Sequence, residues 1–111
     1  MESEELILNS ELDFRYFWPE VLQVVPTDDY GVYAYFNDGS IHYYDVKPLI
    51  KPNTVFEVLQ NINIFKSKIT ILNDTVAWDI KGNRSERDCI DIDVFKIFNS
   101  KETEDPLTTN N

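Results

Sequence analysis

The stretch VYAYFNDGSIHYYDV, residues 32–46, decides the fold. Its first five residues alternate between Val, Ala or Phe and tyrosine, and this period of two is that of a strand with one buried face. Asn37-Asp38-Gly39 follows, and Gly39 tolerates the positive φ angle that a tight hairpin turn requires. A return strand is expected from Ile41 to Val46. The stretch therefore predicts a β-hairpin.

Further elements are expected on both sides of this hairpin. Val21 to Val25 is an apolar, β-branched run that stops at Pro26, which predicts a strand before the hairpin. After the hairpin, Thr54 and Glu57 have the spacing of a capping box, in which each side chain satisfies a free backbone N–H at a helix start. A short helix is therefore expected from Thr54 onward.

The C-terminal half predicts a second hairpin and a last short helix. Residues 68–72 and 75–78 are rich in β-branched and apolar side chains and flank Asn73-Asp74, whereas residues 79–88 are charged and indicate a loop. Asp93 is expected to cap a helix whose apolar residues follow at helical spacing. The predicted fold is α+β, a small antiparallel sheet of about five strands in two hairpins, packed with two or three short helices.

Length and composition fit one domain. A chain of 111 residues is of single-domain size. Its 42% hydrophobic and 14% aromatic residues provide a core, which excludes wholesale disorder. We expect residues 1–13 to be an acidic N-terminal lead-in, residues 14–100 to form the single α+β domain, and residues 101–111 to be a disordered polar tail.

Cysteine use and the apolar runs indicate where the protein resides. Cys89 is the only cysteine, which excludes an internal disulfide and a multi-cysteine zinc site and favours a reducing compartment. Residues 1–5 are acidic where a secretory signal would be basic and then apolar. No apolar run approaches the roughly 20 residues of a membrane span. A cytoplasmic protein that does not enter a membrane is expected.

The net charge of −10 is unevenly distributed along the chain. Residues 1–46 contain one basic residue against ten acidic ones, whereas residues 47–100 contain eight basic and seven acidic ones. Because an acidic half repels phosphate backbones, no direct nucleic-acid binding is expected. The charge fits either a basic surface on a partner or solubility alone.

Five short motifs follow one another along the chain: Val21, Val24, Val25, Pro26, Asp28, Asp29 and Tyr30; Phe36, Asp38 and Gly39; Asp45, Val46, Pro48 and Leu49; Phe56, Leu59 and Phe65; Thr75, Val76 and Trp78. In this order they resemble the family of small, mostly bacterial proteins known as domain of unknown function 2442. The chain departs from the family after Trp78, where Asp79 replaces a proline and several extra residues precede Asp91.

The resemblance carries limited functional information. It implies a small antiparallel sheet with short helices and no established catalytic activity. Members of the family occur alone, beside small partner genes, or fused to a helix-turn-helix. A small partner protein is therefore implied by the resemblance, while the fold alone does not define a function.

No catalytic, metal-binding or nucleotide-binding signature is present. His42 lies inside a hairpin strand, and Ser40, two residues away, is not in a nucleophile elbow. Cys89 begins an apolar run, which favours a packed thiol over an activated one. Asp91 and Asp93 lack the full spacing of a calcium loop. We expect that the protein is not an enzyme and uses no cofactor or metal.

The hairpin tyrosines Tyr33, Tyr35, Tyr43 and Tyr44 are the candidate interaction surface. Tyr33 and Tyr35 share one strand face, and Tyr43 or Tyr44 joins them from the return strand. Exposed tyrosines suit binding because each offers a rigid ring and a hydroxyl group. The alternative is that these rings only stabilise the sheet by packing across the strands.

Phe56, Phe65 and Trp78 form a second candidate site, an apolar pocket between sheet and helix. The alternative is that they fill the core. The prediction is a non-enzymatic protein–protein interaction module that binds a small partner protein or associates with itself, for instance as a homodimer. A protein with a small-ligand pocket is the alternative function.

Overall fold

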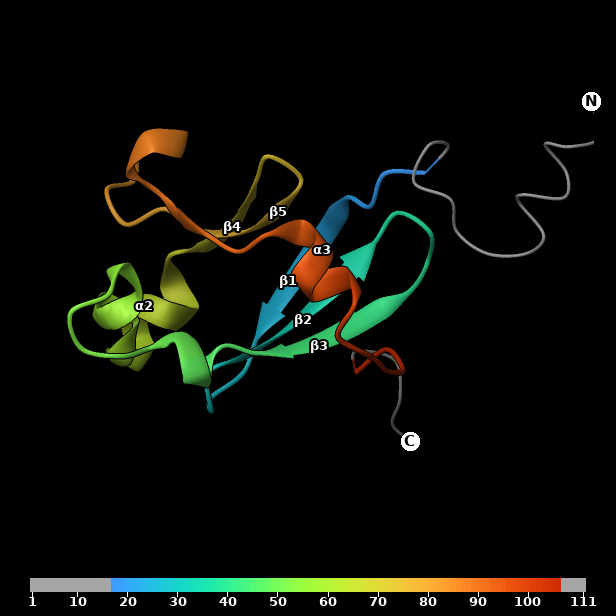
Figure 1. Ribbon diagram of the computed structural model, residues 1–111, viewed down its shortest axis with the longest axis horizontal. Coiled ribbons are helices and arrows are strands. Elements are labelled where there is room, and N and C mark those ends of the chain that lie inside the picture. Colours follow the sequence, from blue (N-terminus) through green and yellow to red (C-terminus); the bar gives the residue numbers. More distant parts are fainter. Residues whose placement is uncertain (1–16, 107–111) are drawn as a thin grey trace, which may run out of the picture.

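The structure, a computed structural model, describes residues 17–106 and contains two antiparallel sheets (Figure 1). The first sheet has the strand order β1-β2-β3-β7, with β1 at Val21–Pro26, β2 at Gly31–Phe36, β3 at Ile41–Asp45 and β7 at Lys101–Glu102. The second has the order β4-β5-β6, with β4 at Ile69–Leu72, β5 at Thr75–Trp78 and β6 at Ile90–Asp91.

Short helices connect these strands. The α-helices are α2 at Ile62–Ser67 and α3 at Val94–Phe98, and the 3-10 helices are η1 at Lys47–Leu49, η2 at Val55–Gln60 and η3 at Glu86–Asp88. This arrangement confirms the predicted α+β class. The strands divide into two sheets, however, where the sequence predicts one.

β1 contains a β-bulge at the end that lies next to the second sheet. The register of β1 against β2 shifts between Val21 and Gln23, and the side chain of Leu22 between them is 62% exposed. A bulge bends its strand and interrupts regular pairing. The β4–β5 hairpin lies beside β1 without extending its ladder, and a backbone bond from Val21 N to Asp74 O at 2.9 Å connects the two.

Both predicted hairpins are present. In the first, Tyr33 lies opposite Tyr43 and Val32 lies opposite Tyr44, as the alternating pattern requires. In the second, Asn73 and Asp74 both have positive φ angles, of 53° and 67°, which is the backbone shape of the tightest hairpin turns.

The helix starts are capped by the residue types that the sequence indicates, with one change. Asp93 Oδ1 accepts from Phe95 N at 3.0 Å and so caps α3 as predicted. At η2, Thr54 Oγ1 accepts from Phe56 N at 3.2 Å, and Glu57 Oε1 accepts from the N–H of Asn53 at 3.0 Å. Glu57 thus bonds to the residue before the cap and not to Thr54 itself, and the segment that follows is a 3-10 helix where a capping box predicts an α-helix.

The boundary predicted at residue 101 is wrong for the first residues beyond it. Lys101 and Glu102 form β7 against β3, and Thr103 N donates to Ile41 O at 2.7 Å. The physical reason is that β3 would otherwise be an unpaired edge, which the polar segment can cover with its backbone alone. The predicted lead-in at residues 1–13 lies outside the described residues, as do residues 107–111.

The core lies on one face of the first sheet. Side chains of both sheets, η2, α2 and α3 meet there, and α3 lies across the first sheet and contacts β3 (Figure 1). The fully buried members with the largest side chains are Trp78, Phe65, Leu59 and Ile97. The alternate residues of β2 and β3 point to the opposite face of the first sheet. Among residues 17–106, no helix has the length and apolar character needed to cross a membrane.

Candidate functional site

The candidate site is the face of the first sheet that points away from the core. Tyr33 on β2 and Tyr43 on β3 are direct cross-strand partners, with ring centroids 5.1 Å apart and planes inclined by 57°. Tyr35 lies on the same face and its hydroxyl donates to Asp105 Oδ1 at 2.6 Å. Lys101 lies opposite Tyr43 on β7. We call this surface, with Tyr33, Tyr35, Tyr43 and Lys101, the tyrosine face.

Tyr44 does not belong to the tyrosine face. Successive residues of a strand point to opposite sides, so Tyr44 shares the side of its cross-strand partner Val32, which is fully buried. Tyr44 is half-buried and packs against the core. The sequence left Tyr43 and Tyr44 as alternatives for joining Tyr33 and Tyr35, and the register selects Tyr43.

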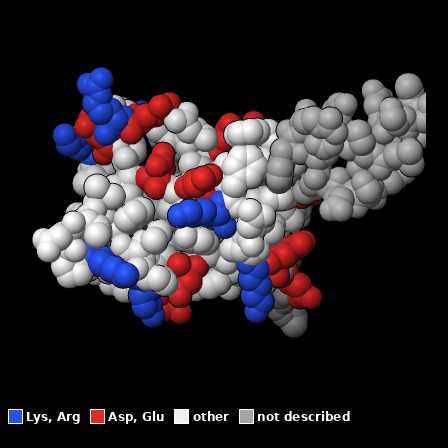
Figure 2. Space-filling model, viewed as in Figure 1, with Lys and Arg blue, Asp and Glu red and all other residues white. Residues whose placement is uncertain are grey.

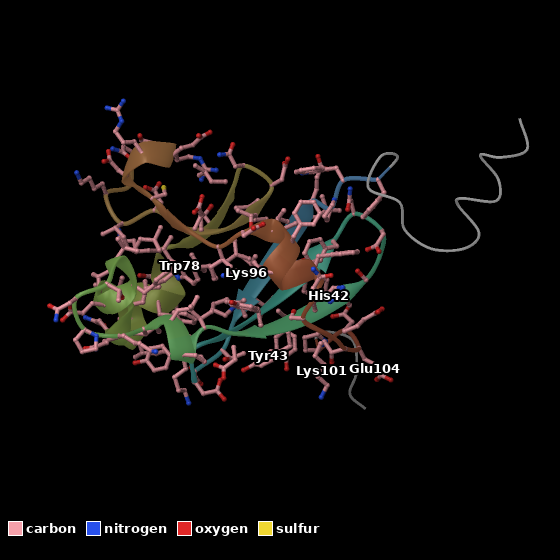
Figure 3. The ribbon with its side chains drawn as sticks, viewed as in Figure 1. His42, Tyr43, Trp78, Lys96, Lys101 and Glu104 are labelled. Atoms are coloured by element: carbon pink, nitrogen blue, oxygen red, sulfur yellow. The ribbon has the colours of Figure 1, made fainter. Side chains whose placement is uncertain are left out.

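A pocket of about 300 Å³ opens on the tyrosine face, and Figure 3 shows Tyr43 and Lys101 beside each other along β3. Three elements supply its walls: the β1–β2 turn, the β2–β3 pair and the C-terminal segment. The lining residues are Thr27, Asp29, Tyr33, Tyr43, Lys101 and Thr103.

Gly31 allows the Tyr43 ring to lie in this position. A Cβ atom added at Gly31 would lie 2.0 Å from Tyr43 Oη and 2.4 Å from Cζ, far inside van der Waals contact. The Tyr43 ring therefore leans across β2 toward the β1–β2 turn, over a residue that has no side chain. A glycine inside a strand often marks such a close approach.

The β1–β2 turn orients its two carboxylates differently. Asp28 forms an ion pair with Lys66 of α2. Tyr30 has a positive φ angle of 69°, and its hydroxyl donates to Gln60 O. Asp29 instead accepts from Thr27 Oγ1 at 2.5 Å and lines the pocket. One carboxylate thus fixes the turn against the helices, and the other is presented to the tyrosine face.

The field in the pocket is negative at the Tyr43 hydroxyl. Burial raises the pKa of Tyr43 above its usual value of 10.0, and the carboxylates of Asp29 and Asp45 raise it further. Each of these carboxylates disfavours a phenolate and would favour a cation at the same place. The Lys101 ammonium group makes no hydrogen bond or ion pair with other residues in the described range 17–106.

Phe65 and Trp78, two members of the predicted apolar pocket, are fully buried core residues. Their ring centroids lie 5.4 Å apart, and Trp78 Nε1 donates to Phe65 O at 2.9 Å. Phe56 is half-buried against the same core. Figure 3 shows Trp78 in the interior, well away from Tyr43. The three residues line neither the pocket of the tyrosine face nor a second, shallower groove outside η2 and α2.

The second groove is open and mostly polar at its rim. It measures about 630 Å³ and lies where Val55 and Val58 are 70% and 38% exposed. Its lining residues are Thr54, Val55, Glu57, Val58, Gln60, Asn61 and Ile64. No ionisable pair lies in it that would favour a particular ligand.

His42 is an internal structural residue. It is 6% exposed, and its ring packs against Phe36 and Phe98 with centroids 5.3 and 5.1 Å away. Nδ1 lies 3.0 Å from Ser100 O, and Nε2 lies 3.0 Å from Ser40 Oγ. The Ser40 hydroxyl donates to the carboxylate of Asp38 at 2.6 Å. A hydrolytic triad requires histidine between serine and aspartate, whereas here serine lies between the other two.

Cys89 is held in its thiol form. Burial raises the pKa of the Cys89 thiol above the usual 9.0, and the nearby carboxylate of Asp79, whose Oδ1 lies 3.7 Å from Sγ, raises it further. Asp79 also accepts from the backbone N–H groups of Asn83 and Arg84, at 3.2 and 2.9 Å. The residue that replaces the expected proline after Trp78 therefore organises the loop that follows.

Two basic residues of the same loop, Arg84 and Lys81, contact neighbouring polar or acidic groups. Arg84 donates to Thr70 Oγ1 and to Ile71 O on β4, and Lys81 lies 3.5 Å from Asp88. Within the described part of the chain, no three His, Cys, Asp or Glu side chains gather closely enough to hold a metal ion.

Several residues of the tyrosine face were not singled out from the sequence. Lys101 and Thr103 fall in the segment predicted to be disordered, and Asp29 appears in the sequence only as part of the first motif shared with the family. Gly31 offered a signal, since a glycine opening an alternating strand indicates close backbone approach. The alternation of Lys101 and Thr103 across Glu102 was too short to predict a strand.

The comparisons with known proteins agree with the motif order. Residues 21–102 match a family described as protein of unknown function (DUF2442), which covers β1 through β7. A search of curated proteins and a search of solved structures found no match. Because the family match spans most of the chain and all seven strands, the chain belongs to the DUF2442 family.

Proposed function

We propose that this protein is a non-enzymatic interaction module that binds a partner protein, or a second copy of itself, through the tyrosine face. The main support is the contact between the rings of Tyr33 and Tyr43. The two rings lie beside an open pocket, on the sheet face that does not take part in the core.

Tyrosine is suited to this role. Its ring supplies contact area with little loss of conformational entropy, and its hydroxyl bonds to polar groups of a partner. Interface centres are enriched in aromatic residues with a polar rim around them. Here Tyr33 and Tyr43 provide the centre, and Thr27, Asp29 and Lys101 provide the rim.

The chemistry of the remaining candidate groups supports a binding role. His42 is enclosed by aromatic rings and has a polar neighbour at each ring nitrogen, and the raised pKa of Cys89 disfavours a nucleophilic thiolate. Figure 2 shows basic and acidic side chains interspersed on the face that bears α3, without a continuous basic patch among the residues coloured there. The coloured part of the face that bears α3 therefore lacks the basic patch that a nucleic-acid site on it would require.

The test is capture of the tagged full-length chain from its native host, followed by native mass spectrometry. Three proteins are compared: wild type, the double variant Tyr33→Ser/Tyr43→Ser, and the control Val55→Ser, which changes a 70% exposed residue of the second groove. Circular dichroism first verifies that all three fold.

We expect wild type and Val55→Ser to carry the same added protein mass, or the mass of a dimer, and the double variant to appear as a bare monomer. A double variant that retains the complex contradicts the proposal.

A second candidate function, small-ligand binding, is favoured by the pocket of about 300 Å³, which is at the lower limit of ligand sites. It predicts a small added mass that the double variant loses.

A further inference from the structure

We propose that the pocket of the tyrosine face receives an arginine side chain of the partner protein. This inference rests on the proposed binding function and deepens it by naming the group that the pocket recognises. It combines three features: two aromatic rings, a carboxylate beside them, and an excess of negative charge on the same face.

The aromatic rings supply the stacking surface. Tyr33 and Tyr43 touch at 5.1 Å with planes inclined by 57°, so their faces are not stacked on each other and stay available on the pocket side. A planar guanidinium group stacks on such faces, and the attraction is that of a cation to the electron-rich ring face. Gly31 holds the Tyr43 ring in this position because no side chain displaces it.

The carboxylate of Asp29 supplies the counter-ion. One of its oxygens accepts from Thr27 Oγ1, which fixes the orientation of the group at the pocket wall. An ionised carboxylate has about four acceptor positions, so most of its capacity is left for another donor. A guanidinium group donates two parallel N–H bonds to a carboxylate, which a single ammonium group does not.

The charges of the face favour a cation over an anion. Asp45 lies on the same side of β3 as Tyr43, so the carboxylates of Asp29 and Asp45 lie near the pocket, whereas Lys101 is the one basic residue among the described residues that line it. Both carboxylates act at the Tyr43 hydroxyl, whose pKa is raised first by burial and then by Asp29 and Asp45.

Lys101 lines the pocket, and replacing it tests whether the bound group is positively or negatively charged. It lies opposite Tyr43 on β7 and lines the pocket, so its positive charge repels a cation bound there. Replacing Lys101 therefore strengthens binding of an isolated cation, whereas replacing Asp29 weakens it. An anionic ligand requires the opposite pattern, and a zwitterionic ligand is weakened by both changes.

The experiment is an NMR titration of the ¹⁵N-labelled full chain with N-acetyl-arginine amide, which carries a guanidinium group and no other charge. N-acetyl-citrulline amide is the matched control because it has nearly the same shape and no charge. We expect saturable shifts at Tyr33, Tyr43 and Lys101 with the arginine probe and none with citrulline. Equal shifts with the two probes overturn the inference.

The variants Asp29→Asn and Lys101→Gln then decide the ligand charge. The amide introduced by Asp29→Asn keeps an oxygen for the Thr27 bond, and Lys101 is exposed, so both variants preserve the fold. For the arginine probe we expect about two- to fivefold weaker binding in Asp29→Asn and a similar strengthening in Lys101→Gln, in the range of exposed ion pairs. Unchanged affinity in Asp29→Asn overturns the inference.

The capture experiment is scored separately. A partner that binds to a chain that does not respond to the arginine probe refutes this inference and leaves the binding function standing.

Discussion

Gly31 and Tyr43 show how the smallest and one of the largest side chains together shape the candidate site. Tyr43 leans over Gly31, toward the turn that contains Asp29, and this position leaves the neighbouring ring of Tyr33 open to the pocket. The geometry of the pocket therefore depends on a residue that contributes no side chain to it.

Substituting Gly31→Ala is predicted to displace the Tyr43 ring with little loss of stability. The added Cβ would lie 2.0 Å from Tyr43 Oη, and the far end of a half-buried side chain swings away at low cost. We expect a change in unfolding free energy below about 1.5 kcal/mol, together with altered Tyr43 ring resonances and lost probe binding. The control is the Tyr43→Leu background, in which Gly31→Ala should have no further effect on the pocket. An unmoved Tyr43 ring would contradict this description.

Cys89 is predicted to be a slow thiol in the folded protein. Its pKa is raised above 9.0, chiefly by burial and then by Asp79, so at pH 8 the folded chain contains less thiolate than the unfolded chain and reacts more slowly with iodoacetamide. The raised pKa also makes the stability of the fold depend on pH. The unfolded chain releases the thiol proton first as the pH rises past 9, so the contribution of Cys89 to the free energy of unfolding is complete below pH 9 and is lost above it. Fast alkylation of the native protein at pH 8, equal to the rate in denaturant, would contradict the assignment.

At the scale of single elements, β7 connects the fold to the site. Two residues of β7 pair with β3, and Thr103 N adds a backbone bond to Ile41 O. The same segment supplies Lys101 and Thr103 to the pocket. A short strand thus covers the edge of the sheet and forms one wall of the candidate site.

Thr103→Pro is predicted to release this segment. Proline has no N–H, so the bond to Ile41 is lost, and we expect a loss of about 1–3 kcal/mol in unfolding free energy by urea titration, together with loss of the pocket wall. Thr103→Ala keeps the N–H and is the matched control, with a change below about 0.5 kcal/mol. If residues from 101 onward were a disordered tail, the two variants would be equally neutral.

Arg84 is predicted to protect the edge of β4. Its guanidinium group donates to Thr70 Oγ1 at 3.1 Å and to Ile71 O at 2.9 Å, and the Ile71 carbonyl is a backbone acceptor that another strand would use. Arg84→Ala should lower the unfolding free energy by about 1 kcal/mol and increase concentration-dependent association in sedimentation experiments. Arg87→Ala, in the same loop, is the control and should do neither. Equal behaviour of the two variants would show that Arg84 has no such role.

The alternating patterns made the hairpins predictable, while the pairing of distant segments was not. Periodicity in residues 32–46 identifies two strands, and the turn residues set their connection, because both are local properties of the chain. Neither reveals that β7 returns to β3, since that contact joins segments far apart in sequence and is only two residues long. The division into two sheets likewise depends on which distant strands pair, and no local pattern marks that.

The same reasoning explains which site residues the sequence revealed. Tyr33, Tyr35 and Tyr43 were predictable because strand parity places them on one face, whereas the choice between Tyr43 and Tyr44 required the register. The aromatic residues Phe65 and Trp78 could not be divided between pocket and core from the sequence, because both uses require the same apolar side chains. Their full burial and mutual hydrogen bond assign them to the core.

At the scale of the whole molecule, the two faces of the first sheet have different roles. One face is covered by α3 and by the buried side chains of the second sheet, α2 and η2, with Trp78 and Phe65 at the centre. The other carries the tyrosine face and its pocket. An antiparallel sheet with one face in the core commonly exposes the other to solvent, and tyrosines there are in position for a partner.

The most direct test of the central claim is hydroxyl-radical footprinting of the captured assembly against the free chain. Trp18, which is 56% exposed and packs against Phe95 of α3, is the internal reference because it lies away from the tyrosine face. The account predicts that oxidation of Tyr33 and Tyr43 falls severalfold in the assembly while that of Trp18 stays the same. Unchanged oxidation of Tyr33 and Tyr43 in an assembly that protects other residues would contradict it.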